Sequence, residues 1–513
     1  MAGMGLPEGI HDRVRVEYPD YLRDESRRAG TAETISFPRS PAELQAHLVY
    51  ARAAGQAVTV QGARTGITGA SVPDGGHVLN LSKLTAVSEP HATGPGPRCV
   101  TAEPGVTLET LRQALETAAG GQWFFPPDPT ETSASVGGMI ATNASGARTL
   151  RYGPTRRYVT GLRLVLADGD RLSLVRGQRR ADGRRFRLET DGGRTIEGDL
   201  PHYTVPDVKS AAGYFVADDM DLLDLFIGAE GTLGVVAEAD LLLAPAPPAV
   251  WGLQAFLPDE RAALAFVRRV REAGWDAVAA IEFFDARALD LLREQKRTNP
   301  AFSAVPDMPP AWHTAIYVEL HGNEEAVEET MMNVSAAMVA CGGDEDATWL
   351  AADSRELERL KSFRHAVPEA VNLLIDQRRK TEPALTKLGT DLAVPDAVLE
   401  EMFAMYHADL DQCGLDYVIF GHVGNNHVHV NLLPRSRGEY ERGKAVYLAW
   451  AQQVAAWGGT VSAEHGIGKL KTAMLEAMYG SAGIDEMRRL KALFDPEGRL
   501  NPGTLFPFPR STR

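Results

Sequence analysis

Three histidines lie within eight residues in the segment GHVGNNHVHVN, residues 421–431. Apolar residues on both sides predict two strands, and Asn425 and Asn426 predict a tight turn, because asparagine tolerates the positive backbone angles that such turns need. In that register His422 and His429 are directly opposed on one face, with Cβ atoms about 5 Å apart. Two imidazoles at this separation could bind one metal ion or could be a hydrogen-bonded pair in a core, and the segment alone is compatible with either.

A second pair of ionisable residues, Glu464 and His465, lies in the segment VSAEHGIGKLK. Gly466 and Gly468 interrupt a regular strand and allow the backbone to approach a neighbour closely. The small and apolar run over residues 458–463 predicts a buried setting. Two histidines and a carboxylate with one open position are the ligand set of a catalytic rather than a structural metal site. His465 would then be the proton acceptor.

The composition restricts the kind of protein. At 513 residues the chain is expected to form two or more domains, and its 44% hydrophobic and 24% charged content is that of a soluble globular protein. A net charge of −15 argues against a nucleic-acid partner. Three separated cysteines exclude a disulfide framework, a cysteine zinc site and a cysteine-ligated iron–sulfur cluster. The sequence shows no long uncharged apolar run and no signal-peptide pattern, which predicts no membrane-spanning segment and a cytoplasmic setting.

The first half of the chain is expected to alternate short strands, glycine-rich turns and occasional helices. Asp168 and Gly169 separate two apolar runs and predict a hairpin. Residues 176–203 are rich in arginine and glycine, which predicts an exposed excursion. The prolines within 241–252 indicate a domain boundary.

Beyond that boundary, alternating helices and strands predict an α+β second domain. The last segment, from Glu464 onward, is expected to return to glycine-punctuated structure and to pack on the first domain. The regular elements predicted along the chain are helices over residues 44–54, 259–272, 324–340, 355–377 and 442–457, and strands over 57–61 and 314–320.

Three glycine-rich segments lie in the first half of the chain. The first, residues 62–70, follows a strand but lacks the GxGxxG spacing and precedes another strand, so a dinucleotide-binding Rossmann fold is not expected. Its backbone N–H groups suit an anionic pyrophosphate, although an ordinary glycine hairpin would have the same composition. The second and third segments, residues 124–159 and 225–243, carry further small residues that allow close approach to a large flat ligand. Together they indicate a nucleotide cofactor held by the main chain.

These three segments, in this order, resemble the FAD-binding domain shared by vanillyl-alcohol oxidase and p-cresol methylhydroxylase relatives. The later segments GHVGNNHVH, AEHGIG and LFDPEGRLNPG resemble the C-terminal half of the FAD-linked D-2-hydroxy acid dehydrogenases of that superfamily. The resemblance extends over roughly residues 33–507. It implies an α+β protein with three parts. The first is an FAD-binding domain of the p-cresol methylhydroxylase (PCMH) type, with two α/β subdomains, over residues 33–245, and the second is a cap domain with an antiparallel sheet over 246–458. The third is a segment over 459–513 that packs on the FAD-binding domain and completes the active site.

The resemblance also implies FAD as the cofactor, bound non-covalently. Relatives with covalent flavin carry a histidine or cysteine near these loops, whereas this chain has Arg64 and Thr65 in the first loop. The first loop would hold the pyrophosphate through Gly62, Ala63, Arg64, Thr65, Gly66, Ile67, Thr68, Gly69 and Ala70. The other residues implied at the cofactor are Pro127, Asp128, Gly137, Gly138, Thr142, Asn143, Ser145, Gly146, Glu230, Gly231, Val236 and Asn501.

In the metal-dependent relatives, the positions of His422, His429 and Glu464 are those of the zinc or manganese ligands. His465 matches the base, and Asn431 and Arg364 match groups that meet the substrate. Arg364 lies in a predicted helix, where it could fork onto a carboxylate or be an ordinary solvated arginine.

The chain departs from these relatives at several places, among them the stretch VPDVKSAAGYFVADDMDLLDLF, which is longer than usual before the third glycine-rich segment and has no assigned purpose. His427 stands where they usually carry asparagine, and could add a fourth metal ligand or a polar contact to the substrate. The lysine that relatives acting on 2-hydroxyglutarate place before an aspartate is matched by Gly389, with Lys387 two residues earlier. The motif for a second substrate carboxylate is therefore not matched.

The resulting hypothesis is FAD-dependent oxidation of a D-2-hydroxy acid resembling D-lactate to the 2-oxo acid. The electrons would pass to a quinone, a cytochrome, an electron-transfer flavoprotein or an iron–sulfur partner, with peripheral membrane contact as one setting. One alternative is a non-oxidative synthase like alkyl-dihydroxyacetone-phosphate synthase, although the run of consecutive histidines in those enzymes is absent here. Another is a flavin-binding subunit that has no catalysis of its own.

Overall fold

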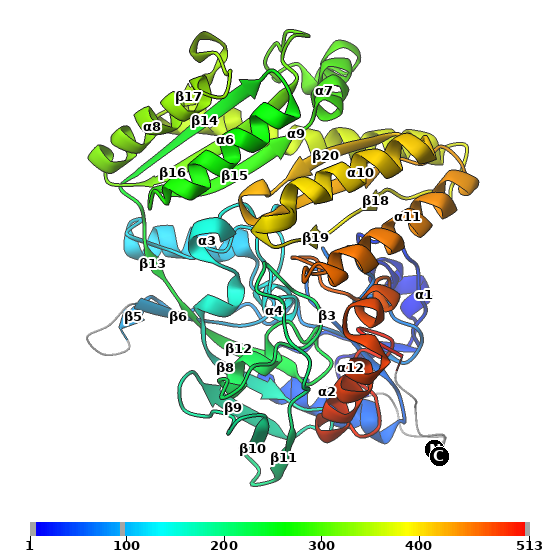
Figure 1. The fold of residues 1–513 in the computed structure, drawn as a ribbon. Helices are drawn as coiled ribbons and strands as arrows, with labels where there is room; N and C mark the ends of the chain where they lie inside the picture. Colours follow the sequence, from blue (N-terminus) through cyan, green and yellow to red (C-terminus); the bar gives the residue numbers. More distant parts are fainter. Residues whose placement is uncertain (1–6, 93–97, 508–513) are drawn as a thin grey trace.

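A computed structural model describes residues 7–92 and 98–507 of the chain. A four-stranded and a five-stranded sheet lie in the lower part of the molecule in Figure 1, and one large sheet forms the upper part. The first small sheet has the order β1-β2-β4-β3, in which β4 runs parallel to both β2 and β3. Its strands are β1 (Ile10–His11), β2 (Thr34–Ser36), β3 (Val58–Gln61) and β4 (His77–Asn80).

Helix α2 (Pro41–Ala53) covers this sheet and confirms the helix predicted over 44–54. The Ser40 side chain accepts a hydrogen bond from the backbone of Glu43, and Pro41 occupies the first turn, so the sequence carries its own start signal. Leu44 and Leu48 lie on the buried face of the helix and pack against Val58.

The second small sheet has the order β5-β6-β12-β8-β9. Its strands are β5 (His91–Ala92), β6 (Arg98–Ala102), β8 (Val159–Val165), β9 (Arg171–Val175) and β12 (Val235–Leu242). Strands β8 and β9 form the hairpin predicted around Asp168 and Gly169, with Val165 opposite Arg171. The short helices α3 (Leu108–Ala119), α4 (Val136–Ala141) and α5 (Thr149–Tyr152) lie between these strands in the sequence.

Residues 176–203 are mainly exposed, as expected, but one face of the segment is buried. They contain a hairpin of β10 (Arg185–Glu189) and β11 (Thr195–Asp199). Apolar residues alternate with charged ones along these strands, so one face is buried and the other carries the arginines. Phe186 on the buried face stacks on Phe494, with ring centroids 6.0 Å apart.

The upper part is an antiparallel sheet of order β17-β14-β16-β15-β20-β21-β18, as expected for the cap. Side chains alternate along the central strand β16, which places Ile316 and Val318 on one face and Tyr317 on the other. Helices α6 and α8 pack on the first face, and α7 and α9 on the second. The strands are β14 (Ala249–Leu257), β15 (Val278–Phe284), β16 (Thr314–Gly322), β17 (Trp349–Ala351), β18 (Leu388–Gly389), β20 (Tyr417–Gly421) and β21 (His427–Leu432).

Four of the six helices of this part agree with predicted ones to within about five residues, and α7 and α10 were not predicted. They are α6 (Glu260–Ala273), α7 (Ala286–Thr298), α8 (Glu324–Val339), α9 (Ser354–Arg379), α10 (Leu399–Cys413) and α11 (Arg437–Ala456). Four of them, at 259–272, 324–340, 355–377 and 442–457, were predicted from the sequence, and the predicted strand over 314–320 is β16.

The final segment returns to the first sheet, as predicted. The Val58 N–H donates to the carbonyl of Arg499 at 2.8 Å, and the Asn501 N–H donates to the carbonyl of Val58 at 2.8 Å. The expectation of glycine-punctuated structure throughout this segment was wrong, because it contains the long helix α12 (Thr472–Phe494). Gly480 kinks this helix with φ +70°, and this glycine hides the helical pattern in the sequence.

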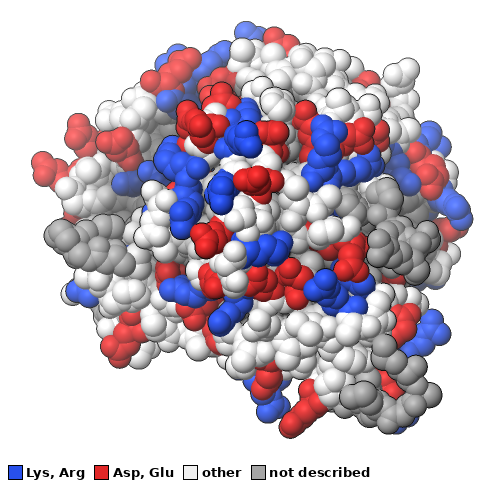
Figure 2. Space-filling model, turned by 90° about the horizontal axis from the view of Figure 1, so that it is seen from below, with Lys and Arg blue, Asp and Glu red and all other residues white. Residues whose placement is uncertain are grey.

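Acidic and basic side chains intermingle over the face shown in Figure 2 and form no broad basic patch among its described residues. Within residues 7–92 and 98–507, no helix is both long enough and apolar enough to cross a membrane.

Candidate active site

One large cavity, with a volume of about 1030 Å³, is lined by residues of both small sheets, of the cap and of the final segment. This volume is at the upper end for small-molecule sites. It brings together His422, His429, Glu464, His465, Arg364 and Asn431. The residues predicted at the cofactor that line it are Gly62, Ala63, Arg64, Thr65, Gly66, Ile67, Thr68, Ala70, Gly137, Gly138, Thr142, Ser145, Glu230, Gly231, Val236 and Asn501.

The first loop presents main chain to this cavity. Within the described residues, the backbone N–H groups of residues 64–68 donate to no other protein group. A Cβ added at Gly66 would meet no protein atom within 4 Å, so the space in front of this residue is open. Consecutive free N–H groups around an open space favour an anion, and a pyrophosphate therefore fits this loop.

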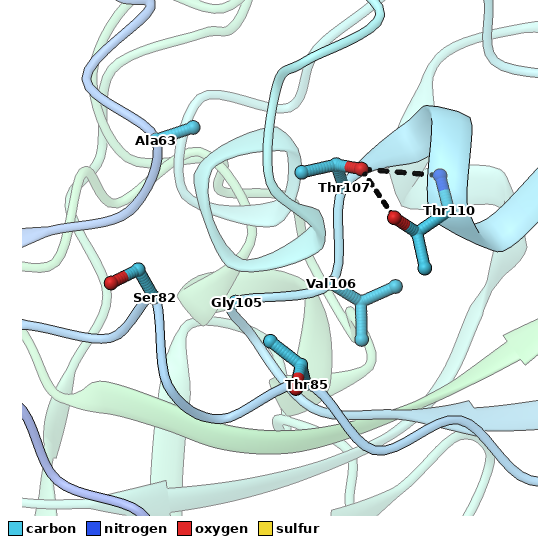
Figure 3. A pocket seen from close by; sticks show the side chains of 7 residues that line it. All are labelled: Ala63, Ser82, Thr85, Gly105, Val106, Thr107 and Thr110. Atoms are coloured by element: carbon cyan, nitrogen blue, oxygen red, sulfur yellow. Dashed lines mark hydrogen bonds between the residues drawn. The ribbon is translucent and has the colours of Figure 1, made fainter.

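A second, smaller cavity of about 220 Å³ lies against the same loop, because Ala63 lines both (Figure 3). Gly105 and Thr107 form part of its wall, and Thr107 caps helix α3 by accepting from the Thr110 N–H at 3.1 Å. Sequence reasoning missed this cavity. A Cβ at Gly105 would come within 2.3 Å of the Leu81 carbonyl, so only glycine fits at this position. This glycine is the sequence signal that could have indicated the cavity.

The structure does not bring Gly69, Pro127, Asp128, Asn143 and Gly146 to the wall of the large cavity. Asp128 instead pairs with Arg112 at 2.6 Å. Asn143 has φ +49° and its Oδ1 accepts from the Arg156 N–H at 2.9 Å. A Cβ at Gly146 would come within 1.8 Å of the Asp128 carbonyl, so these residues pack the second loop against itself.

The tight hairpin predicted for the histidine segment was wrong in its register. Strand β20 ends at Gly421, a 3-10 turn spans Val423–Asn425, and Phe420 rather than His422 lies opposite His429. The five-residue connection 422–426 replaces the two-residue turn because Gly421 (φ +131°) and Asn426 (φ +52°) both take left-handed conformations. The His422 and His429 rings still meet, with centroids 5.5 Å apart.

The two ring Nε2 atoms face the same oxygen. His422 Nε2 lies 3.3 Å and His429 Nε2 3.2 Å from Glu464 Oε1. The opposite nitrogens are also occupied, because His422 Nδ1 lies 2.7 Å from Glu282 Oε1 and His429 Nδ1 lies 2.8 Å from the Thr390 carbonyl. Ligand histidines have this arrangement, in which an outer partner fixes the ring and leaves the other nitrogen for the metal. Sequence reasoning missed both outer partners.

The donor set fits a divalent cation. His422, His427, His429 and Glu464 each offer a ligand atom, and these atoms lie within 4.8 Å of one another. Burial lowers the pKa of His422, but Glu282 and Glu464 raise it to about 9, so the site favours a positive charge. Imidazole nitrogens with a carboxylate oxygen suit zinc or manganese.

Asp391 organises the loop that carries Glu464 and His465. The carboxylate is fully buried and accepts from the backbone N–H groups of Glu464 at 3.1 Å and His465 at 2.9 Å. Asp391 Oδ2 also accepts from Lys471 Nζ at 2.7 Å and lies 3.4 Å from His465 Nδ1. Burial raises the pKa of Asp391, but His465 and Lys471 hold it well below its ordinary value. The TDLAVP motif contains Asp391, and sequence reasoning used this motif only for the lysine before it.

Burial lowers the pKa of His465 to about 4, although Asp391 and Glu464 act to raise it. The ring is therefore neutral near pH 7 and can accept a proton. Glu230 supports the same loop, because its carboxylate accepts from the N–H groups of Ile467 at 2.7 Å and Gly468 at 2.8 Å.

Arg364 reaches the cavity from α9 and pairs with no carboxylate among the described residues. Burial lowers its pKa, while the charges of Glu282 and Asp128 raise it. Its guanidinium is thus charged and available to an anionic ligand. Asn431 lines the same wall from β21.

His427 lies behind this wall. Its side chain is fully buried and does not line the cavity. Lys209 contacts it there, and this lysine lies in a segment before the third glycine loop to which sequence reasoning assigned no purpose.

Two family models match the chain. Residues 32–174 match the FAD binding domain, and residues 247–505 match the C-terminal domain of FAD linked oxidases. "Probable D-lactate dehydrogenase, mitochondrial" from Danio rerio is 31% identical over 94% of this chain and 86% of its own length. The chain belongs to the FAD-linked oxidase family.

Other relatives carry related names. "D-lactate dehydrogenase" from Archaeoglobus fulgidus is 29% identical over 93% of this chain and 92% of its own length. "Glycolate oxidase subunit GlcD" from Bacillus subtilis is 28% identical over 92% of this chain and 89% of its own length. The names of these relatives place the chain among FAD-linked 2-hydroxy acid oxidoreductases.

Solved structures confirm the fold alone. 4-Ethylphenol oxidase from Gulosibacter chungangensis aligns with a TM-score of 0.67 and 17% identity over 99% of this chain and 95% of its own. Alkyldihydroxyacetonephosphate synthase aligns with a TM-score of 0.63 and 14% identity over 97% of this chain and 82% of its own. The PCMH-type FAD-binding domain with a C-terminal oxidase domain is therefore the fold of this chain.

Proposed function

We propose that this protein oxidises a D-2-hydroxy acid resembling D-lactate to the 2-oxo acid, with non-covalent FAD and a divalent cation, zinc or manganese, and passes the electrons to an external acceptor. One observation carries the proposal. A main-chain anion site, a cluster of histidines and a carboxylate, and an unpaired arginine line a single cavity. The domains proposed to form this active site are the FAD-binding part over 33–245, the cap over 246–458 and the segment over 459–513.

Each side chain of the cluster has a proposed task. Arg364 binds the substrate carboxylate through its fork of N–H groups, and Asn431 offers its amide beside it. His465 accepts the hydroxyl proton on Nε2, because its Nδ1 faces Asp391. His422, His429 and Glu464 would hold the cation. His427, predicted at the sequence level as a fourth ligand or a substrate contact, lies too deep to meet the substrate.

The reaction balances as a two-electron oxidation. Bound FAD supplies the acceptor for the α-hydrogen and its electron pair. A bound divalent cation supplies a Lewis acid that favours loss of the hydroxyl proton. The hydroxyl proton goes to His465, the C–H bond breaks as the C=O bond forms, and a quinone, cytochrome, electron-transfer flavoprotein or iron–sulfur partner later takes the two electrons.

A second candidate substrate carries another anionic group. Lys387 lines the cavity, and no residue that the structure describes forms an ion pair or hydrogen bond with it. Burial and, to a smaller extent, the charge of Arg27 together lower its pKa to about 8. An unpaired ammonium in a cavity wall favours a ligand with a second carboxylate, although Gly389 stands at the position of the family's lysine.

Anaerobic bleaching of the flavin absorbance tests the proposal. Purified, metal-replete, FAD-loaded protein is mixed with D-2-hydroxy acids that have short apolar, long apolar or carboxylate side chains. Rapid bleaching by one class supports the dehydrogenase and identifies its substrate. Absence of bleaching by every acid contradicts it and favours the non-oxidative synthase or a flavin-binding subunit without catalysis.

A further inference from the structure

A buried lysine lies beside the histidines and the carboxylate. The Lys209 side chain is 3% exposed, and its Nζ lies 2.6 Å from Glu464 Oε2 and 3.2 Å from His427 Nδ1. Burying an ammonium group is costly unless its N–H donors are used. The Lys209 ammonium therefore uses its donors on Glu464 and His427, which lie at the cation site.

The two oxygens of Glu464 have different partners. Oε1 faces His422 Nε2 at 3.3 Å and His429 Nε2 at 3.2 Å, whereas Oε2 accepts from Lys209. A carboxylate with one oxygen held in this way presents its other oxygen to the cation that the two histidine nitrogens would bind. The lysine thus fixes both the rotation of Glu464 and which of its oxygens faces the two histidines.

His427 completes the arrangement from the other side. An ammonium group only donates, so His427 Nδ1 must accept and its proton must be on Nε2. Nε2 lies 3.1 Å from Asp391 Oδ1, and the same oxygen accepts from the backbone N–H of Glu464. The contacts run from the Glu464 carboxylate through Lys209, His427 and Asp391 back to the Glu464 backbone.

The chain segment that carries Lys209 is fixed in place. The Ala211 N–H donates to the Ser462 carbonyl at 2.8 Å, and Ser210 Oγ lies 2.9 Å from Thr460 Oγ1. These contacts tie the segment before the third glycine loop to the strand-like run that leads into Glu464. The position of the Lys209 ammonium is therefore fixed by the contacts of its own segment with residues 460–462.

We propose that Lys209 is a positioning residue. Held by His427, it orients Glu464 so that a single oxygen faces the cation, and we call this arrangement the brace. His427 belongs to the brace and is not a ligand of the cation. The inference rests on the proposed cation site.

Two substitutions at Lys209 separate positioning from charge. Lys209→Met and Lys209→Gln both remove the charge, but only glutamine keeps a donor for Glu464. Cobalt affinity is measured by equilibrium dialysis of FAD-loaded, metal-free protein, and cobalt geometry by low-temperature electron paramagnetic resonance. We expect Lys209→Met to bind cobalt about 10–100-fold more weakly than Lys209→Gln, the range for loss of an outer partner, with an altered signal. Lys209→Gln keeps the wild-type signal.

His427→Asn tests the role of the histidine, and Lys444→Met is the matched control. Lys444 is another lysine of the cavity wall, which pairs with Glu441 at 3.6 Å and makes no contact with the cluster. We expect both variants to keep wild-type cobalt affinity and signal. Loss of the signal in His427→Asn would make His427 a ligand and overturn its assignment.

Equal affinities and wild-type signals in Lys209→Met and Lys209→Gln would overturn the brace, because the lysine would then act by charge alone. That result leaves the cation site intact. A wild-type protein that binds no cobalt would instead overturn the cation site and the brace together. Retained FAD content and melting temperature in each variant exclude general unfolding as the cause.

Discussion

The large cavity has two walls of different construction. The wall formed by residues 62–68 and by Gly137, Gly138, Thr142 and Ser145, here the loop wall, offers main chain and small side chains. The wall around Glu464, here the cluster wall, offers ionisable side chains. On the loop wall, the backbone N–H groups of residues 64–68 have no partner among the described residues, and we expect side-chain identity to matter little beyond size. On the cluster wall, both ring nitrogens of His422 and His429 and both carboxylate oxygens of Glu464 have partners within the protein. The first wall should tolerate exchange of side-chain chemistry, and the second should not.

The largest effect is expected on the cluster wall. His465→Asn removes the proton acceptor while leaving its neighbours in place, and we expect flavin reduction to slow by about 10²–10⁴-fold. Stopped-flow absorbance under anaerobic conditions measures this rate. The FAD content should equal that of the wild type, and unchanged reduction would exclude His465 as the base.

Removal of the cation should have the next largest effect. Dialysis against a chelator is expected to slow flavin reduction by about 100-fold or more, since Lewis-acid stabilisation amounts to several kcal/mol. The spectrum of bound FAD should stay unchanged, and zinc or manganese should restore the rate. Full activity of a protein shown by elemental analysis to be metal-free would contradict the role of the cluster.

Substitutions in the first loop test the other wall. Gly66→Val places a side chain in the open space before the free N–H groups, and we expect FAD to bind about tenfold more weakly, the loss of roughly one hydrogen bond. Thr65→Ala leaves the main chain unchanged and should alter FAD affinity less than threefold by the same reasoning. Fluorescence titration of the apoprotein measures both. A stronger effect of Thr65→Ala than of Gly66→Val would show that side chains hold the cofactor.

Lys387 should give the smallest effect, limited to substrate choice. Its pKa of about 8 means that the side chain is charged below this pH and loses its charge above it. KM for an acid with a second carboxylate should therefore rise as the pH passes 8, while KM for D-lactate changes less. Lys387→Met should remove that difference in pH dependence. A difference that persists in the variant would place the contact elsewhere.

Local sequence signals predicted several of the helices, whereas the fold class was implied by the resemblance to a known family. Helix α2 has a serine cap and a proline in its first turn, and α6 and α8 also begin after side-chain caps, so neighbouring residues fix where they start. The kinked helix α12 was missed because Gly480 interrupts the pattern that marks a helix. The β10–β11 hairpin was missed because its buried side is recognised only when Phe494 is in place.

The candidate site was predictable only in part. His422, His429 and Glu464 could be grouped from residue type and from the resemblance to known enzymes, but the register between the two histidines could not. Glu282 and Asp391 were missed because each meets its partner over a separation of 73–140 residues, which no local pattern encodes. Lys209 was missed for the same reason, since 255 residues separate it from Glu464.

The most direct test of the central claim compares the two enantiomers of one acid. FAD-loaded, metal-replete protein is mixed anaerobically with the D and L forms of lactate, or of the acid that bleaches the flavin fastest, and the rate of flavin reduction is recorded for each. We predict rapid reduction by the D form only, with a slower rate when its α-hydrogen is replaced by deuterium. Equal reduction by the L form, or a rate unaffected by deuterium at saturating substrate in single-turnover reduction, would contradict oxidation of a D-2-hydroxy acid at this site.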